Sequence, residues 1–254
     1  MLTRKLVPDF GIFEQHGGGN GLVLQQAPED SSNNHSLVLV TAGDGTEAVW
    51  LDALVASAAQ NTHTRIVIVD CCGSGTDHDA RVLQRLGVPS SYVVRVSLSQ
   101  VLLGANREED VYASALKEIS TVAKGAVLVL RNADFLIPMA VTQNSGPDVA
   151  RFLWFVRKVG VLAHTVYVHM RAPLSSGISP ETGHDRYAVA AKCAATGVAH
   201  VAQAVVSVRA LGTGRAADVT GTVTIGRGGG SGVKVATGTY QYLVTHDGVK
   251  IFYL

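Results

Sequence analysis

The sequence predicts an α/β protein with a mostly parallel central sheet, helices on both faces and an antiparallel extension at the C-terminal end. Short, continuous apolar runs such as 37–40 and 66–69 are typical of strands buried on both faces. Segments with helical periodicity alternate with these runs, which favours parallel strands joined by helices. Residues 209–254 instead show period-two alternation between Gly-rich turns, which is typical of antiparallel strands.

Each expected strand is an apolar run between polar or glycine-containing turns. We expect strands at 36–41, 65–70, 92–98, 126–130, 161–170 and 198–208. In the tail, residues 222–225 alternate Thr with Val and Ile, which predicts a half-buried strand. Tyr240, Tyr242 and Val244 share one side of the next strand, and Asp247-Gly248 is a dipeptide typical of a hairpin turn.

The helices are expected from their apolar periodicity and their end signals. We expect helices at 47–60, 76–86, 107–123, 147–160 and 184–196. Thr46 can cap the first helix, because its hydroxyl accepts a hydrogen bond from an N–H of the first turn. Gly87 and Pro89 end the second helix, and Pro147 is expected in the first turn of the fourth, where its missing N–H costs nothing.

The composition indicates one domain that is covered in part by other proteins. We expect a flexible N-terminal extension over residues 1–35 and a single domain over residues 36–254. Only 16% of the residues are charged, against about 25% in an average globular chain, so partner subunits are expected on part of the surface. The net charge of +1 gives no global basic field for nucleic acid but allows a local patch.

The cysteines indicate a reducing, intracellular compartment. Cys71, Cys72 and Cys193 cannot all pair, and adjacent cysteines rarely bridge each other. The N-terminus lacks a signal-peptide pattern, and no apolar run reaches the ~18 residues of a membrane span. We therefore expect a cytoplasmic protein, with a nuclear pool as a further expectation, and no membrane partner.

The turn after the first strand lacks the residues that bind nucleotide phosphates. A phosphate loop needs Gly-x-x-x-x-Gly-Lys-Ser/Thr, but residues 41–48 contain no Lys and place Asp44 and Glu47 there. The strand at 126–130 is followed by Arg131 and Asn132 instead of an acidic Mg²⁺ ligand. We expect no intact Walker motif, no cofactor in this chain's own loop and no ATP hydrolysis by it.

The tail resembles a known family. Its motifs are Leu211-Gly212-Thr213-Gly214, then Asp218-Val219-x-Gly221-x-Val223-x-Ile225, then Tyr240-x-Tyr242, then Val249-x-Ile251-Phe252. These motifs are similar to those of the sixth subunit of the Elongator complex, and the match spans about residues 36–253. The Gly-rich linker at 226–232 departs from the family pattern.

The resemblance implies a RecA-like fold that has lost its nucleotide-binding signatures, a pseudo-ATPase. The family forms a hetero-hexameric ring with Elongator subunits four and five, two copies of each of the three chains. That ring associates with the catalytic Elongator subcomplex, which modifies the wobble uridine of tRNA, and it binds tRNA itself. The resemblance therefore implies an accessory subunit without an active site of its own.

No residue pattern supports a catalytic or metal site. Cys71-Cys72 lacks a Cys-x-x-Cys partner and suits buried packing, while His78 between two acidic residues suits a helix N-terminus. RNA contact is expected instead at the loop after the fifth strand, which is polar, glycine-containing and flanked by arginines. The candidate RNA-binding residues are Arg171, Ser175, Ser176, His184 and Arg186.

Two segments are candidates for subunit contact. The helix at 151–158 has large apolar residues almost all round, so a neighbour is expected to cover one side. The aromatic tail strands are expected to pair with another subunit. The candidate interface residues are Phe152, Trp154, Phe155, Tyr240, Tyr242 and Phe252.

Two other function classes stay open on the sequence. A divergent RecA-like ATPase or nucleotide-binding protein would use a changed loop, and ATP held between subunits is compatible with either class. A RecA-like recombination protein acting on DNA is disfavoured, because such proteins generally keep the phosphate loop that residues 41–48 lack.

Overall fold

A computed structural model describes residues 35–43, 49–62, 64–73, 77–99, 110–139, 147–171, 186–211, 216, 218–230, 235, 237–245 and 248–253. The expected extension lies outside this part of the chain except for His35. Among the helices that are described, none is long and apolar enough to cross a membrane.

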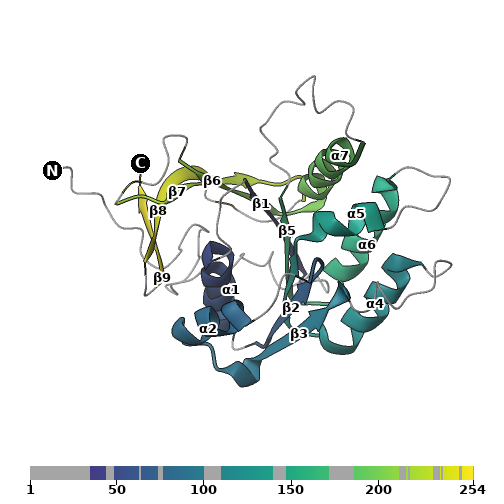
Figure 1. Cartoon of the computed structure of the whole chain (residues 1–254), viewed down its shortest axis with the longest axis horizontal. Coiled ribbons are helices and arrows are strands. Elements are labelled where there is room, and N and C mark those ends of the chain that lie inside the picture. Colours follow the sequence, from purple (N-terminus) through teal and green to yellow (C-terminus); the bar gives the residue numbers. More distant parts are fainter. Residues whose placement is uncertain are drawn as a thin grey trace, which may run out of the picture.

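The described strands form a single sheet, shown in Figure 1. Its order is β3-β2-β4-β5-β1-β6-β7-β8-β9, parallel from β3 to β6 and antiparallel from β6 to β9. The strands are β1 (Ser36–Ala42), β2 (Ile66–Asp70), β3 (Val93–Ser97), β4 (Val127–Arg131), β5 (Thr165–Met170), β6 (Ala204–Ala210), β7 (Gly221–Arg227), β8 (Gly238–Thr245) and β9 (Gly248–Tyr253). This arrangement confirms the predicted α/β class with its parallel centre and antiparallel C-terminal part.

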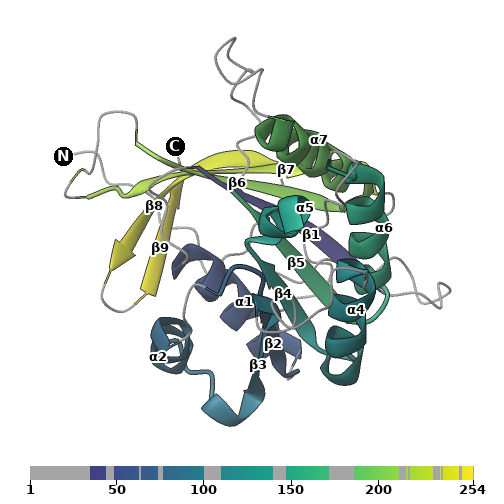
Figure 2. The same cartoon turned by 45° about the vertical axis from the view of Figure 1, so that its right-hand side comes forward.

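Helices cover both faces of the sheet, as Figures 1 and 2 show. Helices α1 and α2 lie on one face, and α4, α6 and α7 lie on the other. The helices are α1 (Val49–Thr62), α2 (Asp77–Arg85), α4 (Val111–Val122), α5 (Leu136–Met139), α6 (Val149–Gly160) and α7 (Arg186–Val201). Two 3-10 turns, η2 (Ser90–Tyr92) and η3 (Ala133–Phe135), complete the described elements.

Each face of the sheet packs into its own apolar core, because successive side chains of a strand point to opposite faces. Along β1, Val38 and Val40 join the core beneath α1, whereas Leu37 and Leu39 join the core beneath α4, α6 and α7. The tail strands belong to the first of these cores. Tyr240 and Tyr242 are buried there in the same cluster as Trp50 of α1, so the antiparallel extension folds back over α1.

Helix α7 corrects a predicted boundary. The strand expected from Val198 begins only at Ala204, because α7 continues to Val201. Buried residues at helical spacing explain the extra turn, since Ala194, Ala195 and Val198 all face the core. Apolar residues in both elements hide the boundary in the sequence.

The expected Gly-rich linker is in part a packed segment. Gly228–Gly230 runs against the end of α7, where Gly229 N–H donates to Ala199 O (2.9 Å) and Gly230 N–H donates to Ala202 O (2.8 Å). These bonds satisfy helix-end carbonyls that have no partner within the helix. A Cβ on Gly230 would lie 2.8 Å from Val201 O, so the close approach requires glycine.

The position of Pro147 needs correction. Pro147 precedes the N-cap residue Asp148, whose carboxylate accepts from Arg151 N–H, so Pro147 lies just outside α6. The chain continues after β4 with η3 and the short helix α5. Hairpin pairing of Thr245 with Gly248 fits the predicted reversal, and Asp247 itself lies outside the described residues.

Candidate functional site

Polar side chains gather where the parallel strands β2, β4 and β5 end. The carboxyl ends of parallel strands share one edge of a sheet, and ligands of open α/β folds bind outside that edge. Here β2 ends in Asp70, β4 ends in Arg131 and β5 leads into Arg171. We take this edge as the candidate functional site.

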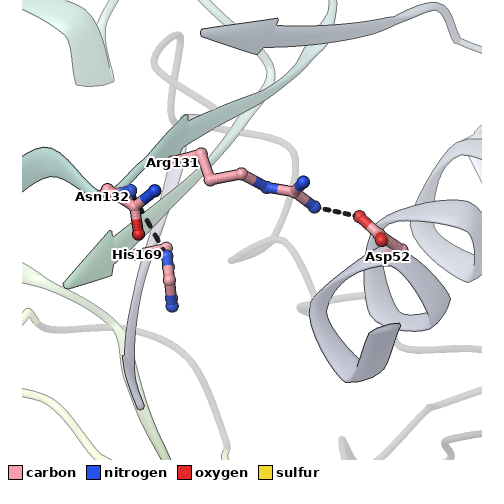
Figure 3. Close-up of polar contacts among 4 residues, drawn as sticks. All are labelled: Asp52, Arg131, Asn132 and His169. Carbon is pink, nitrogen blue, oxygen red and sulfur yellow. Dashed lines mark hydrogen bonds and ion pairs between the residues drawn. The ribbon is translucent and has the colours of Figure 1, made fainter. Parts of the chain in front are cut away.

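Its central interaction is a buried ion pair between strand β4 and helix α1. Arg131 Nη2 contacts Asp52 Oδ1, and the two residues are only 6% and 2% exposed. Figure 3 shows the guanidinium reaching from the end of the strand to the helix. Asp52 lies in the first turn of α1, where the positive end of the helix dipole favours a carboxylate.

Asn132 connects three segments of the site. Its backbone adopts a left-handed conformation, with φ 56° and ψ 48°, which is uncommon outside glycine. Its N–H donates to His169 Nδ1 (3.3 Å), its side-chain Nδ2 donates to Cys72 Sγ (3.0 Å), and its Oδ1 accepts from Arg171 Nε (3.1 Å). The residue therefore ties β4 to the ends of β2 and β5.

His169 is a neutral, buried acceptor. Burial, and then the positive charges of Arg131 and Arg171, lower the pKa of His169 to about 4. At neutral pH its Nδ1 therefore has the lone pair that the Asn132 N–H needs. Figure 3 shows this contact close to the ion pair.

The end of β2 is held by its own backbone and side chains. Cys72 N–H donates to Asp70 Oδ1 (3.1 Å), and Cys71 N–H donates to Arg131 O (3.1 Å). Cys71 is fully buried, and burial followed by the charge of Asp70 raises the pKa of its thiol well above the usual value. A thiol that stays protonated is a poor nucleophile, so Cys71 acts as a buried apolar residue.

The arrangement places a guanidinium where P-loop ATPases place a Mg²⁺ ligand. Among the described residues, no group of three or more His, Cys, Asp or Glu side chains could hold a metal ion. The two nearest carboxylates are engaged, since Asp52 pairs with Arg131 and Asp70 accepts from Cys72. The polar groups at the described strand ends therefore bind one another within the chain.

Residues 172–185, which the structure does not describe, contain three of the five predicted RNA-binding residues, and the other two flank this segment. Ser175, Ser176 and His184 belong to that segment. Arg171 and Arg186 border it and are exposed, and Arg171 also donates its backbone N–H to Asp134 Oδ1 (3.1 Å). The two arginines are thus accessible, while their contact with RNA stays a prediction.

Several predicted interface residues lie inside the chain's own core, which corrects that expectation. Phe152 and Phe155 lie on the buried side of α6 and are fully buried, and Tyr240 and Tyr242 are buried against α1. Their apolar character is explained by packing within the domain. Of the six candidates, only Trp154, which is 46% exposed, and the partly buried Phe252 have surface for a partner.

Two members of the site, Asp52 and His169, are not apparent from the sequence. Asp52 was hidden in an apolar helical pattern, and His169 was one of several scattered histidines. An acidic residue within an apolar helix, together with an arginine at the end of a buried strand, is the signal that could have indicated the ion pair. Arg131 is apparent from the sequence, because it follows the buried strand at 126–130, where an acidic Mg²⁺ ligand is expected.

The sheet order and the helices on both faces define a RecA-like α/β domain. The fold is similar to that of a KaiC-like protein from Pyrococcus horikoshii, with a TM-score of 0.51 and 15% sequence identity. The similarity covers 85% of this chain and 89% of that protein. The flagellar accessory protein FlaH from Methanocaldococcus jannaschii gives a TM-score of 0.54 at 13% identity, covering 87% of this chain and 91% of that one. No protein-family profile and no curated protein sequence matches the chain. The two structures show the RecA-like fold.

Proposed function

We propose that this chain is a non-catalytic RecA-like subunit of the Elongator complex. It would form a hetero-hexameric ring with Elongator subunits four and five, two copies of each chain. The ring would bind tRNA and support the modification of the wobble uridine by the catalytic subcomplex. The chain's own loop would hold no nucleotide.

The observation that carries the non-catalytic role is the Asp52–Arg131 ion pair. A RecA-like ATPase needs an acidic residue at the end of the fourth strand to hold Mg²⁺. Arg131 stands there instead and is paired with Asp52, so this strand end offers Mg²⁺ an ion pair that is already neutralised and not an available carboxylate. This chemistry disfavours phosphoryl transfer at this strand end.

The tail motifs support the Elongator assignment. Val223 and Ile225 of β7 and Tyr240 and Tyr242 of β8 are buried in the core over α1. These motif residues therefore hold the last strands on this domain, and their resemblance to the Elongator family is what supports the assignment. Trp154 and Phe252 are the candidates for subunit contact, and Arg171 and Arg186 are the candidates for tRNA contact.

Co-expression with the fourth and fifth Elongator subunits tests this proposal. Native mass spectrometry should find a complex of six chains, two of each kind. Trp154→Ala should lower the yield of that complex, whereas Tyr92→Ala, which removes an equally exposed aromatic from η2, should not. A chain that stays alone in this experiment contradicts the Elongator assignment, and ATP binding by it would favour the nucleotide-binding alternative.

A further inference from the structure

Helix α6 presents one exposed stripe that combines aromatic, apolar and basic side chains. The helix contacts α4 and α7 and buries Phe152, Phe155, Val156 and Val159. On its other side Trp154 is 46% exposed, Arg157 and Lys158 are exposed, and Val161 directly after the helix is 60% exposed. Arg157 and Lys158 follow Trp154 by three and four residues and Val161 follows it by seven, so the four side chains share one side of the helix. We call Trp154, Arg157, Lys158 and Val161 the α6 outer face.

In the part of the chain that the structure describes, no acidic side chain compensates the charges of the α6 outer face. Helix α6 contains no acidic residue, and its N-cap Asp148 is held by the Arg151 N–H. Arg151 forms an ion pair with Asp110, whereas neither Arg157 nor Lys158 pairs with an acidic side chain among the described residues.

The surrounding helical layer is also basic. Segments 110–124, 147–160 and 186–201 carry seven Lys or Arg against three Asp or Glu, a net +4 in a chain of net +1. The basic residues are Lys117, Lys124, Arg151, Arg157, Lys158, Arg186 and Lys192, and the acidic ones are Asp110, Glu118 and Asp148. This layer therefore attracts a negatively charged partner.

The surroundings of Trp154 favour a protein partner over a nucleic acid. Lys158 Nζ lies over the Trp154 ring, 5.9 Å from its centroid, so a cation already covers one face of the indole. Base stacking uses the open face of an aromatic ring. The indole edge and the Val161 side chain form instead an apolar strip beside two cations, which suits apolar side chains flanked by carboxylates.

We propose that the α6 outer face binds an acidic amphipathic helix of a partner protein. Apolar residues of that helix would pack on Trp154 and Val161, and its Asp or Glu residues would pair with Arg157 and Lys158. Such a helix lays its apolar side along a complementary surface with anchors three, four and seven residues apart. The inference rests on the proposed role of Trp154 in partner contact and adds the chemistry of the partner.

Binding of labelled model helices to the purified full chain tests this inference. The probes are an amphipathic peptide with a leucine stripe flanked by Glu, its counterpart flanked by Lys, and a single-stranded RNA oligonucleotide. Fluorescence anisotropy should show the Glu peptide binding at least tenfold more tightly than the Lys peptide, with affinity that falls as salt rises. The Arg157→Glu/Lys158→Glu variant should reverse this preference, and Trp154→Ala should weaken the Glu peptide at least fivefold.

Matched controls separate local contact from overall charge. Lys117→Glu changes an exposed cation on α4 and should alter Glu-peptide affinity less than twofold. Equal binding of the two peptides, no binding of the Glu peptide at millimolar concentration, or tighter binding of the RNA would overturn the inference. Since the lone chain is used, these outcomes are independent of ring assembly, and a ring that forms without peptide binding leaves the proposed function standing.

Discussion

Arg131 at the end of β4 forms a buried ion pair with Asp52 in the first turn of α1. The pair joins the central sheet to the helix that follows β1, the helix that in P-loop ATPases receives the nucleotide phosphates at its N-terminus. Arg131 thus supplies from within the chain a positive charge at a strand end where related folds use Mg²⁺. The presence of Arg131 at a strand end that would otherwise bind Mg²⁺ connects the fold to the proposed non-catalytic role.

The first prediction concerns the stability of this pair. Removing one partner of a buried ion pair leaves an uncompensated charge, so Arg131→Ala should lower the free energy of unfolding by about 3–5 kcal/mol. The double variant Asp52→Leu/Arg131→Met should lie within about 1 kcal/mol of the wild type, because it removes both charges. Urea unfolding of the single variants Asp52→Leu and Arg131→Met, together with the double variant, measures the coupling. A loss below about 1 kcal/mol for both singles would show that the pair does not hold α1 to β4.

The second prediction concerns pH. The pKa of His169 is about 4 in the folded chain, below the usual 6.5, so the unfolded chain binds more protons between these values. Stability should therefore be full above pH 6.5 and fall as the pH drops toward 4, with a loss of about 3 kcal/mol from this residue. His169→Asn can keep an acceptor for the Asn132 N–H and should flatten the pH dependence of the unfolding midpoint in this window. An unchanged slope in the variant would refute the assignment.

The third prediction concerns the buried hydroxyl of Tyr112. Its ring packs against Phe155 and Phe152, with centroids 5.3 Å and 6.4 Å apart, while the hydroxyl has no hydrogen-bond partner among the described residues. Tyr112→Phe removes an unpaired polar group and keeps the ring, so it should leave stability unchanged or raise it by about 1 kcal/mol. Tyr112→Ala should cost about 3–5 kcal/mol. Thermal unfolding distinguishes the two, and a large loss in the Phe variant would mean that the hydroxyl is bonded.

The fourth prediction concerns the glycines that pack on α7. A Cβ on Gly230 would lie 2.8 Å from Val201 O and 2.9 Å from Ala202 O, both backbone atoms that cannot easily move. Gly230→Ala should therefore destabilise the chain by about 1–3 kcal/mol. Gly160→Ala is the matched control, since its Cβ would meet nothing within 4 Å and alanine favours the helix by about 1 kcal/mol. Equal effects of the two substitutions would contradict the packed role of the glycine segment.

The alternation of strand and helix could be predicted because each parallel strand is a continuous apolar run. The end of α7 could not, because Val198 and Val201 suit a buried helix as well as a strand. The tail strands were predicted from their alternation, but the sequence does not say what their buried side faces. Tyr240 and Tyr242 therefore looked available to another subunit, whereas they pack on α1.

The site was predictable only in part, for a similar reason. Arg131 follows a recognisable buried strand, so its position at the strand end could be predicted from the sequence alone. Its partner Asp52 is 79 positions away, and the pairing depends on how α1 packs on the sheet. His169 lies near the end of β5. The apolar pattern of that strand predicts that His169 is buried, but it does not predict that the Asn132 N–H donates to its Nδ1.

Isothermal titration of the purified chain with Mg²⁺ and ATP, followed by a phosphate-release assay, tests the central claim most directly. We expect no Mg²⁺-dependent binding up to millimolar ATP and no phosphate release above the buffer rate, because Arg131 stands where the metal ligand would be. Mg²⁺-dependent ATP binding together with ATP turnover would contradict the proposed non-catalytic role and would show that the chain is a divergent ATPase.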